Sequence, residues 1–157
     1  MISEYELQSG LDDYLAAAAT ALGLIVRWPG QAREGVNGAA SPPSTPVTGE
    51  VGWVGKTTWI EPSVLSRTNR AISMMRGYEE DGGTYQIAIV SQVLRGPYPL
   101  HEVVDLLRPY YRQGSSQILS PSGRPLHFLR ADPRPVFEAA GNLRLPMLVP
   151  FSVYAPG

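Results

Sequence analysis

The C-terminal part of the chain contains the stretch Asn142-Leu143-Arg144-Leu145-Pro146-Met147-Leu148-Val149-Pro150-Phe151-Ser152-Val153-Tyr154. Its apolar residues recur at every second position, which is the period of a β-strand with one face in the core. We therefore expect a long strand here, stabilised mainly by burial of that face. The residues that share the apolar face are Leu143, Leu145, Met147, Val149, Phe151 and Val153.

Two prolines lie on the opposite parity of this stretch. Residues of one parity direct their backbone groups toward the same neighbouring strand, so Pro146 and Pro150 lack their N–H donors on the same side. We expect that side to have no regular partner, which makes the stretch an edge strand or one with an irregular neighbour. An edge protected in this way can still meet one chosen partner. Arg144, Pro146 and Pro150 are therefore the predicted edge-strand interface.

Length and composition favour a single globular domain over residues 1–157. Hydrophobic residues make up 43% of the chain and charged residues 17%, which is typical of a folded protein and not of a disordered one. The 16 glycines and 15 prolines predict many turns. We expect residues 30–56 to form a long loop and arm, because Gln31 to Gly49 holds almost no large apolar residue.

Several classes of protein are disfavoured by composition. The chain has no cysteine, so disulfides and thiolate metal sites are impossible. It has no apolar run long enough to span a membrane and no secretory signal at its N-terminus. The net charge is −1 and the basic residues are scattered, which argues against a nucleic-acid reader with a basic face.

Two helices are predicted. Ser3 and Glu6 fit a capping box at the start of a helix that ends at Leu22, before Gly23. A second helix begins near Pro99 and should kink or end at Pro109.

Strands account for most of the remaining pattern, with a hairpin tip expected at Tyr78 to Gly83. Together these elements predict an α+β fold, with a mainly antiparallel β-sheet and two α-helices packed on one face. The expected strands are Leu24 to Trp28, Thr57 to Val64, Thr84 to Val93, Gln117 to Leu119, Pro125 to Arg130 and Val136 to Ala139.

Motifs with known chemistry are weak in this sequence. The segment from Gly55 to Thr58 has part of a phosphate-loop pattern, but Glu50 stands where the pattern needs glycine. His101 and His127 are the two histidines, and neither has a neighbouring carboxylate in a catalytic or metal-binding arrangement. We therefore predict no catalytic, cofactor-binding or metal-binding residue, and no enzymatic activity.

The acidic run Glu79, Glu80 and Asp81 sits in the expected hairpin tip. An ordinary solvated turn is one interpretation. The other is that the tip faces a charged partner, as a docking point for arginines, or lines a pore through which DNA slides without binding.

The order of these elements resembles the tail terminator proteins of long-tailed, siphovirus-like bacteriophages. The resemblance rests on Leu24 to Pro29 after the first helix, on Gly83 to Ile89, and on Pro135 to Glu138 leading through Gly141 into the C-terminal strand. The chain departs from the family in a longer segment from Leu65 to Asp81 and in Pro109 within the second helix.

The resemblance implies a structural role without catalysis. Tail terminators are α+β subunits that form a homohexameric ring. The ring caps the tail tube, stops its polymerisation and joins the tail to the head–tail connector or stopper protein. The implied partners are other copies of the chain, the tail tube protein and the connector, with viral DNA passing through the channel. The implied location is the neck of the virion, after assembly in the host cytoplasm.

Two alternatives remain open from the sequence. One is another neck or tail ring subunit, such as a head-completion protein. The other is a small α+β ligand-binding or hydrolase domain that uses His127.

Overall fold

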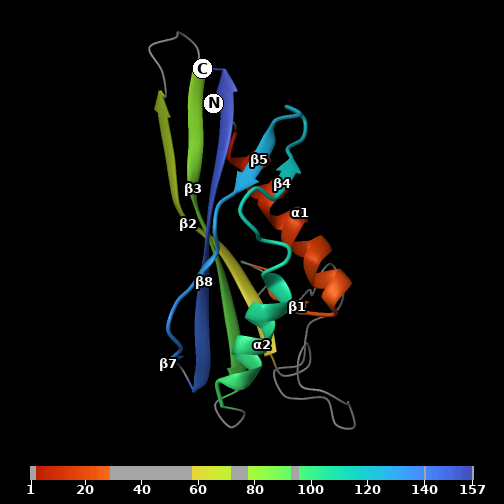
Figure 1. The fold of residues 1–157 in the computed structure, drawn as a ribbon, viewed down its shortest axis with the longest axis vertical. Coiled ribbons are helices and arrows are strands. Elements are labelled where there is room, and N and C mark those ends of the chain that lie inside the picture. Colours follow the sequence, from red (N-terminus) through yellow and green to blue (C-terminus); the bar gives the residue numbers. More distant parts are fainter. Residues whose placement is uncertain (1–2, 29–57, 72–77, 93–95, 140, 157) are drawn as a thin grey trace.

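The chain folds as an α+β structure with one curled sheet and two helices (Figure 1). The sheet has the strand order β1-β2-β3-β8-β5-β4, and β6 and β7 also pair with β8. All these pairs are antiparallel except β1 with β2, so the expectation of a mainly antiparallel sheet is confirmed. The computed structural model describes residues 3–28, 58–71, 78–92, 96–139 and 141–156.

The long strands β2, β3 and β8 run the length of the molecule, with the short strands and the helices beside them (Figure 1). The expected loop and arm over residues 30–56 lie outside the described residues. The elements are α1 Glu4–Leu22, β1 Ile25–Val26, β2 Thr58–Ala71, β3 Tyr78–Gln92, α2 Tyr98–Leu107, β4 Ser116–Ile118, β5 Pro125–Phe128, β6 Asp132–Pro133, β7 Phe137–Ala139 and β8 Asn142–Pro156.

Helix α1 begins and ends where the sequence predicts. The backbone N–H of Glu6 donates to Ser3 Oγ over 3.1 Å, and Gly23 takes the left-handed conformation with φ of 70°. The reciprocal half of the capping box is replaced by a longer-range contact, because the Glu6 carboxylate accepts from the N–H of Ser122 at 2.8 Å. That bond ties the start of α1 to the turn between β4 and β5.

Strand β8 is an inner strand, so its prediction as an edge strand is wrong. It pairs with β3 along its whole length on one side. On the other side it meets β5, β6 and β7 in short pieces, which confirms the alternative of an irregular neighbour. The carbonyls of Pro150 and Pro146 accept from Leu129 and Arg134 at 2.8 Å each. Because the prolines offer acceptors but no donors there, a continuous ladder cannot form.

The alternating face of β8 forms the core, as predicted. Leu143, at its start, is only partly buried. Both helices contribute to the same core cluster, so both cover this face of the sheet. The buried residues are Leu145, Met147, Val149, Phe151 and Val153 from β8, Leu7, Leu11 and Leu15 from α1, and Leu100, Val103 and Leu107 from α2.

The predicted hairpin tip at Tyr78 to Gly83 is wrong, because these residues begin strand β3. Gly83 lies beside a bulge between Val64 and Ser66 of β2, and a Cβ on Gly83 would lie 2.0 Å from Ser66 O. The glycine therefore serves a close backbone approach and not a turn. Strand β2 is correspondingly longer than expected.

The second helix and the following hairpin agree with the sequence. Helix α2 ends at Leu107, two residues before Pro109, as a helix does when proline cannot continue it. Strands β4 and β5 pair as the expected hairpin. Tyr111 and Phe128 from this part of the chain pack with Tyr14 of α1, with ring centroids 4.7 to 5.2 Å apart.

Candidate docking groove between α1 and β2

Strand β2 provides a long edge of the described sheet. On its outer side β1 pairs only with Trp59 and Ile60, where Arg27 N–H also donates to Ile60 O at 2.8 Å. Within the described residues, β2 has no further strand on that side. Backbone direction alternates along a strand, so Pro62 and Val64 face the same edge as Ile60. Because Pro62 faces this outer edge, its missing N–H removes no hydrogen bond between β2 and β3.

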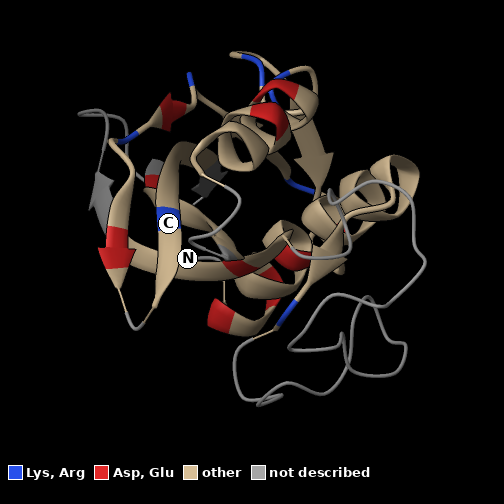
Figure 2. Cartoon of the chain, turned by 90° about the horizontal axis from the view of Figure 1, so that it is seen from below, with Lys and Arg blue, Asp and Glu red and all other residues tan. Residues whose placement is uncertain are grey.

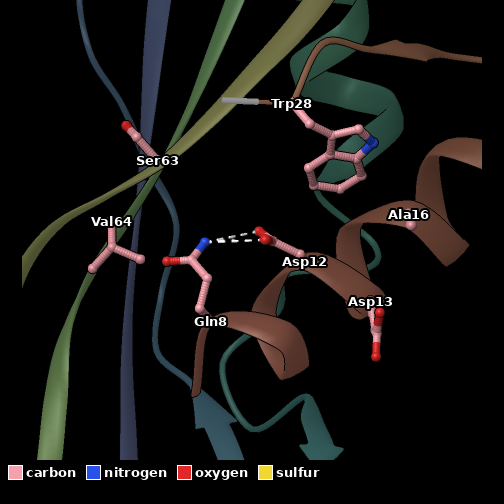
Figure 3. Close-up of a pocket in the computed structure, with 7 residues that line it drawn as sticks. All are labelled: Gln8, Asp12, Asp13, Ala16, Trp28, Ser63 and Val64. Carbon is pink, nitrogen blue, oxygen red and sulfur yellow. Dashed lines mark hydrogen bonds between the residues drawn. The ribbon is translucent and has the colours of Figure 1, made fainter. Parts of the chain in front are cut away.

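A groove separates this edge from α1 (Figure 3). Its larger part is a cavity of about 560 Å³, and its smaller part, of about 280 Å³, shares Gln8 and Val64 with the first. We call the two together the α1–β2 groove. Its lining residues are Glu4, Leu7, Gln8, Asp12, Asp13 and Ala16 from α1, Trp28, and Ser63, Val64, Leu65, Ser66 and Arg67 from β2.

The Asp12 carboxylate is fixed in the groove by two donors. Gln8 Nε2 lies 3.1 Å from both of its oxygens, and Tyr85 Oη donates to Oδ1 at 2.6 Å (Figure 3 draws the Gln8 contact). Burial raises the pKa of Tyr85, and the charge of Asp12 and the hydrogen bond raise it further. Tyr85 therefore remains a donor at neutral pH. Asp13, the next residue along α1, adds an exposed carboxylate to the lining and points away from Gln8 (Figure 3).

Arg67 closes one end of the groove. Its guanidinium lies 3.5 Å from Glu4 Oε1 and 3.6 Å from Asp81 Oδ1. Asp81 is 0% exposed, so its predicted place in a channel lining is wrong. Glu80 is half-buried on the opposite face of β3, and the side chain of Glu79 lies outside the described residues. Asp81 is therefore not part of a projecting tip.

Arg144 also has a role within the subunit. Both its terminal nitrogens contact Glu61 Oε2, at 2.9 and 2.6 Å, across the intervening strand β3. Arg27 shares the same carboxylate at 3.8 Å and stacks over the Trp59 ring at 4.6 Å. Arg144, Pro146 and Pro150 therefore lie on an inner strand, and the predicted edge-strand interface is wrong in its placement.

The histidines do not meet at a site. His101 is exposed on α2, whereas His127 is half-buried on β5, opposite Ser116 and Ser152. Neither lines the α1–β2 groove. The described part of the chain holds no cluster of three or more residues of metal-ligating type, and none of its helices is long and apolar enough to cross a membrane.

A basic surface lies at the end of α2. A cavity of about 410 Å³ there is lined by Asp105, Arg108, Pro109, Tyr111, Arg112, Gln113, Arg130 and Ala131. Its three arginines are exposed. We call this the α2 basic pocket. In the view from below, Lys and Arg residues lie at several separate places and not on one continuous face (Figure 2).

Sequence reasoning missed both surfaces, although a signal for one was present. Pro62, within the predicted strand Thr57 to Val64, lacks a backbone N–H donor on one side of the strand, as Pro146 and Pro150 do in theirs. There it would have indicated the true edge. The α2 basic pocket has no such local signal, because Arg130 comes from a separate part of the chain.

The chain matches no family model and no curated protein. It is similar in fold to a solved structure whose name states no function. The TM-score is 0.62, the identity is 12%, and the match covers 98% of this chain and 96% of the other. At that identity the similarity concerns the fold alone.

Proposed function

We propose that this chain is a structural subunit of the tail-terminator type from a long-tailed bacteriophage. Copies of it close into a ring, expected to be a hexamer, at the end of the tail tube. The ring stops tube polymerisation and joins the tail to the head–tail connector. The protein belongs to the neck of the virion and catalyses no reaction.

The edge of β2, which has no strand beyond β1 on its outer side within the described residues, is the observation that carries this proposal. The strand has 14 residues, and only its first part is paired on the outer side among the described residues. An open edge of this length invites association and is normally covered. A head-to-tail contact between copies covers it in every subunit of a closed ring, with no edge left over.

The segments behind the family resemblance support the proposal by their arrangement. Gly83 to Ile89 lies in β3, and Leu143 to Tyr154 lies in β8, and these two strands pair throughout. Pro135 to Glu138 leads into β7, which folds back on β8 through Gly141 with φ of 79°. Two of the three segments behind the resemblance therefore form one connected unit of the sheet, whereas the third leads into β1 at the end of the strand order.

The mechanism of such a ring is occupancy. The tube grows because each added layer presents the same surface to the next one. A ring that binds this surface but presents a different far face ends the stack, and that far face is free to bind the connector. DNA passes through the channel, and no sequence-specific contact is needed.

Tube growth tests the proposal. The purified protein is added to polymerising tail tube protein of the same virus, and tube length is measured against time. We expect growth to stop at roughly one ring per tube, whereas tubes without the protein continue to lengthen. Unchanged tube lengths at saturating protein would contradict the proposal.

Both alternatives leave tube growth unaffected, and light scattering after size-exclusion chromatography separates them. A head-completion subunit would form a ring. A ligand-binding or hydrolase domain that uses His127 would remain monomeric.

A further inference from the structure

Acidic and basic residues are separated along this chain. The first 26 residues contain Glu4, Glu6, Asp12 and Asp13 and no Lys or Arg. By contrast, residues 108–134 contain five arginines and a single acidic residue, Asp132. The α1–β2 groove takes its acidic residues from the first segment and is also lined by Arg67, whereas the α2 basic pocket takes its arginines from the second segment and is also lined by Asp105.

The two charged surfaces are distinct within one subunit. They share no lining residue. Tyr111, at the wall of the basic pocket, packs on Tyr14 of α1. Tyr14 follows Asp12 by two positions, and positions two apart in an α-helix point about 200° apart. The groove and Tyr111 thus lie on opposite sides of α1. Because the two charged surfaces face away from each other in one subunit, they are suited to pair between copies.

We propose that the α1–β2 groove of one copy receives the α2 basic pocket of the next copy. Arg108, Arg112 and Arg130 then face Asp12 and Asp13. The contact joins two different surfaces, so it is heterologous, and its repetition closes a ring when the rotation between neighbouring copies divides a full turn evenly. This inference rests on the proposed ring and names the surfaces that form it.

An exposed apolar side chain lines the groove, and others are adjacent in sequence to lining residues of the two surfaces. Leu65 is 53% exposed at the groove, and Tyr5, next to Glu4, is 82% exposed. Leu129, next to Arg130, is 43% exposed. Large apolar or aromatic anchors beside arginine are typical of interface centres, where charge supplies orientation and apolar burial supplies affinity.

Charge reversal tests the pairing. Asp13→Arg and Arg130→Asp each change an exposed side chain and leave the partly buried Asp12–Tyr85 contact intact. Light scattering after size-exclusion chromatography measures the assembled mass. We expect each variant alone to require at least about tenfold more protein than wild type for half-assembly, because like charges then face each other.

A mixture of the two variants makes the test specific. In equal amounts they can alternate around a ring, so that every contact again joins opposite charges. We expect the mixture to recover the wild-type mass. Glu138→Arg, on exposed β7, is the matched control and should assemble normally alone. Circular dichroism confirms that each variant is folded.

The outcomes separate this inference from the proposed function. If wild type forms a ring and the single reversals assemble equally well, or if the mixture fails to recover, the groove and basic pocket are not the paired surfaces. The ring itself would then stand. If wild type remains monomeric at every concentration tested, the proposed function fails.

Discussion

Phe151 tests which face of β8 is buried in the core. It lies on the core face of this strand and is 2% exposed. Replacement by alanine removes most of a buried ring and leaves a cavity, so Phe151→Ala should lower the free energy of unfolding by roughly 3–5 kcal/mol. Chemical denaturation measures the change. Leu148→Ala, on the half-buried opposite face, should cost less. A loss under about 1 kcal/mol for Phe151→Ala would contradict the observed packing.

The buried tyrosines predict a loss of stability at high pH. Burial is the main cause that raises the pKa of Tyr85 and of Tyr111 above the ordinary value. The folded state therefore holds these protons more tightly than the unfolded state, whose tyrosines titrate near pH 10. Their contribution is complete below about pH 10 and falls as the pH rises further.

Denaturation curves between about pH 8 and 11.5 check this dependence. We expect the free energy of unfolding to fall above about pH 10, and to fall less steeply in Tyr85→Phe than in wild type. Tyr98→Phe is the matched control, because Tyr98 is 78% exposed. An equal alkaline loss in Tyr85→Phe and in wild type would argue against a buried, proton-holding Tyr85.

At the residue scale, the sequence does not distinguish glycines needed for a turn or helix end from glycines needed for close packing. Gly23 was predictable as a helix stop, and it takes the left-handed conformation. Gly10 lies inside α1 where Leu119 packs closely against the helix, and a Cβ there would lie 2.2 Å from Leu119 Cδ2. Gly83 faces the bulge of β2. These last two requirements come from distant segments, so local pattern alone gave no reason for Gly10 and suggested a turn for Gly83.

At the scale of elements, strand identity was predictable but strand position was not. The period-two pattern of β8 and the prolines that mark its irregular side are local properties. The choice between an edge and a broken neighbour depends on where β5, β6 and β7 fold, and a three-residue strand carries little signal. The position of β2 at the edge also depends on where other segments fold, so the local pattern did not predict it.

The acidic run illustrates the consequence for candidate sites. Asp81 is at the same register as Asn69 of β2 and contacts Arg67, so it belongs to the link between α1 and the sheet. A charge reversal there would leave a buried repulsion and would report on folding and not on a DNA channel. The groove, in contrast, needs three segments to meet, and no single one predicts it.

The β2 edge predicts a pattern of amide exchange. The N–H of Val64 faces the outer edge, whereas the amides of β3 lie between two paired strands. In the isolated subunit Val64 should exchange much faster than Ile87, because no further strand of the described residues pairs with that side of β2. In the proposed ring Val64 should become protected. Equal exchange rates for Val64 in both states would place the contact between copies elsewhere.

At the scale of the whole molecule, charge separation along the chain connects the fold to the proposed assembly. The fold places the acidic N-terminal helix beside an edge of β2 that has no further strand among the described residues, and it places the arginine-rich segment at a separate surface. A net charge of −1 conceals this division. Self-association through two unlike surfaces requires only one kind of chain, which is what a ring-forming subunit needs.

Electron microscopy of tube ends is the direct test of the proposed ring. Tail tubes of the virus proposed as the source are grown with the protein present and then imaged. We expect a ring at one end of each arrested tube, with sixfold symmetry and the β2 edge covered by the neighbouring copy. Arrested tubes with bare ends, or protein bound along the tube wall, would contradict it.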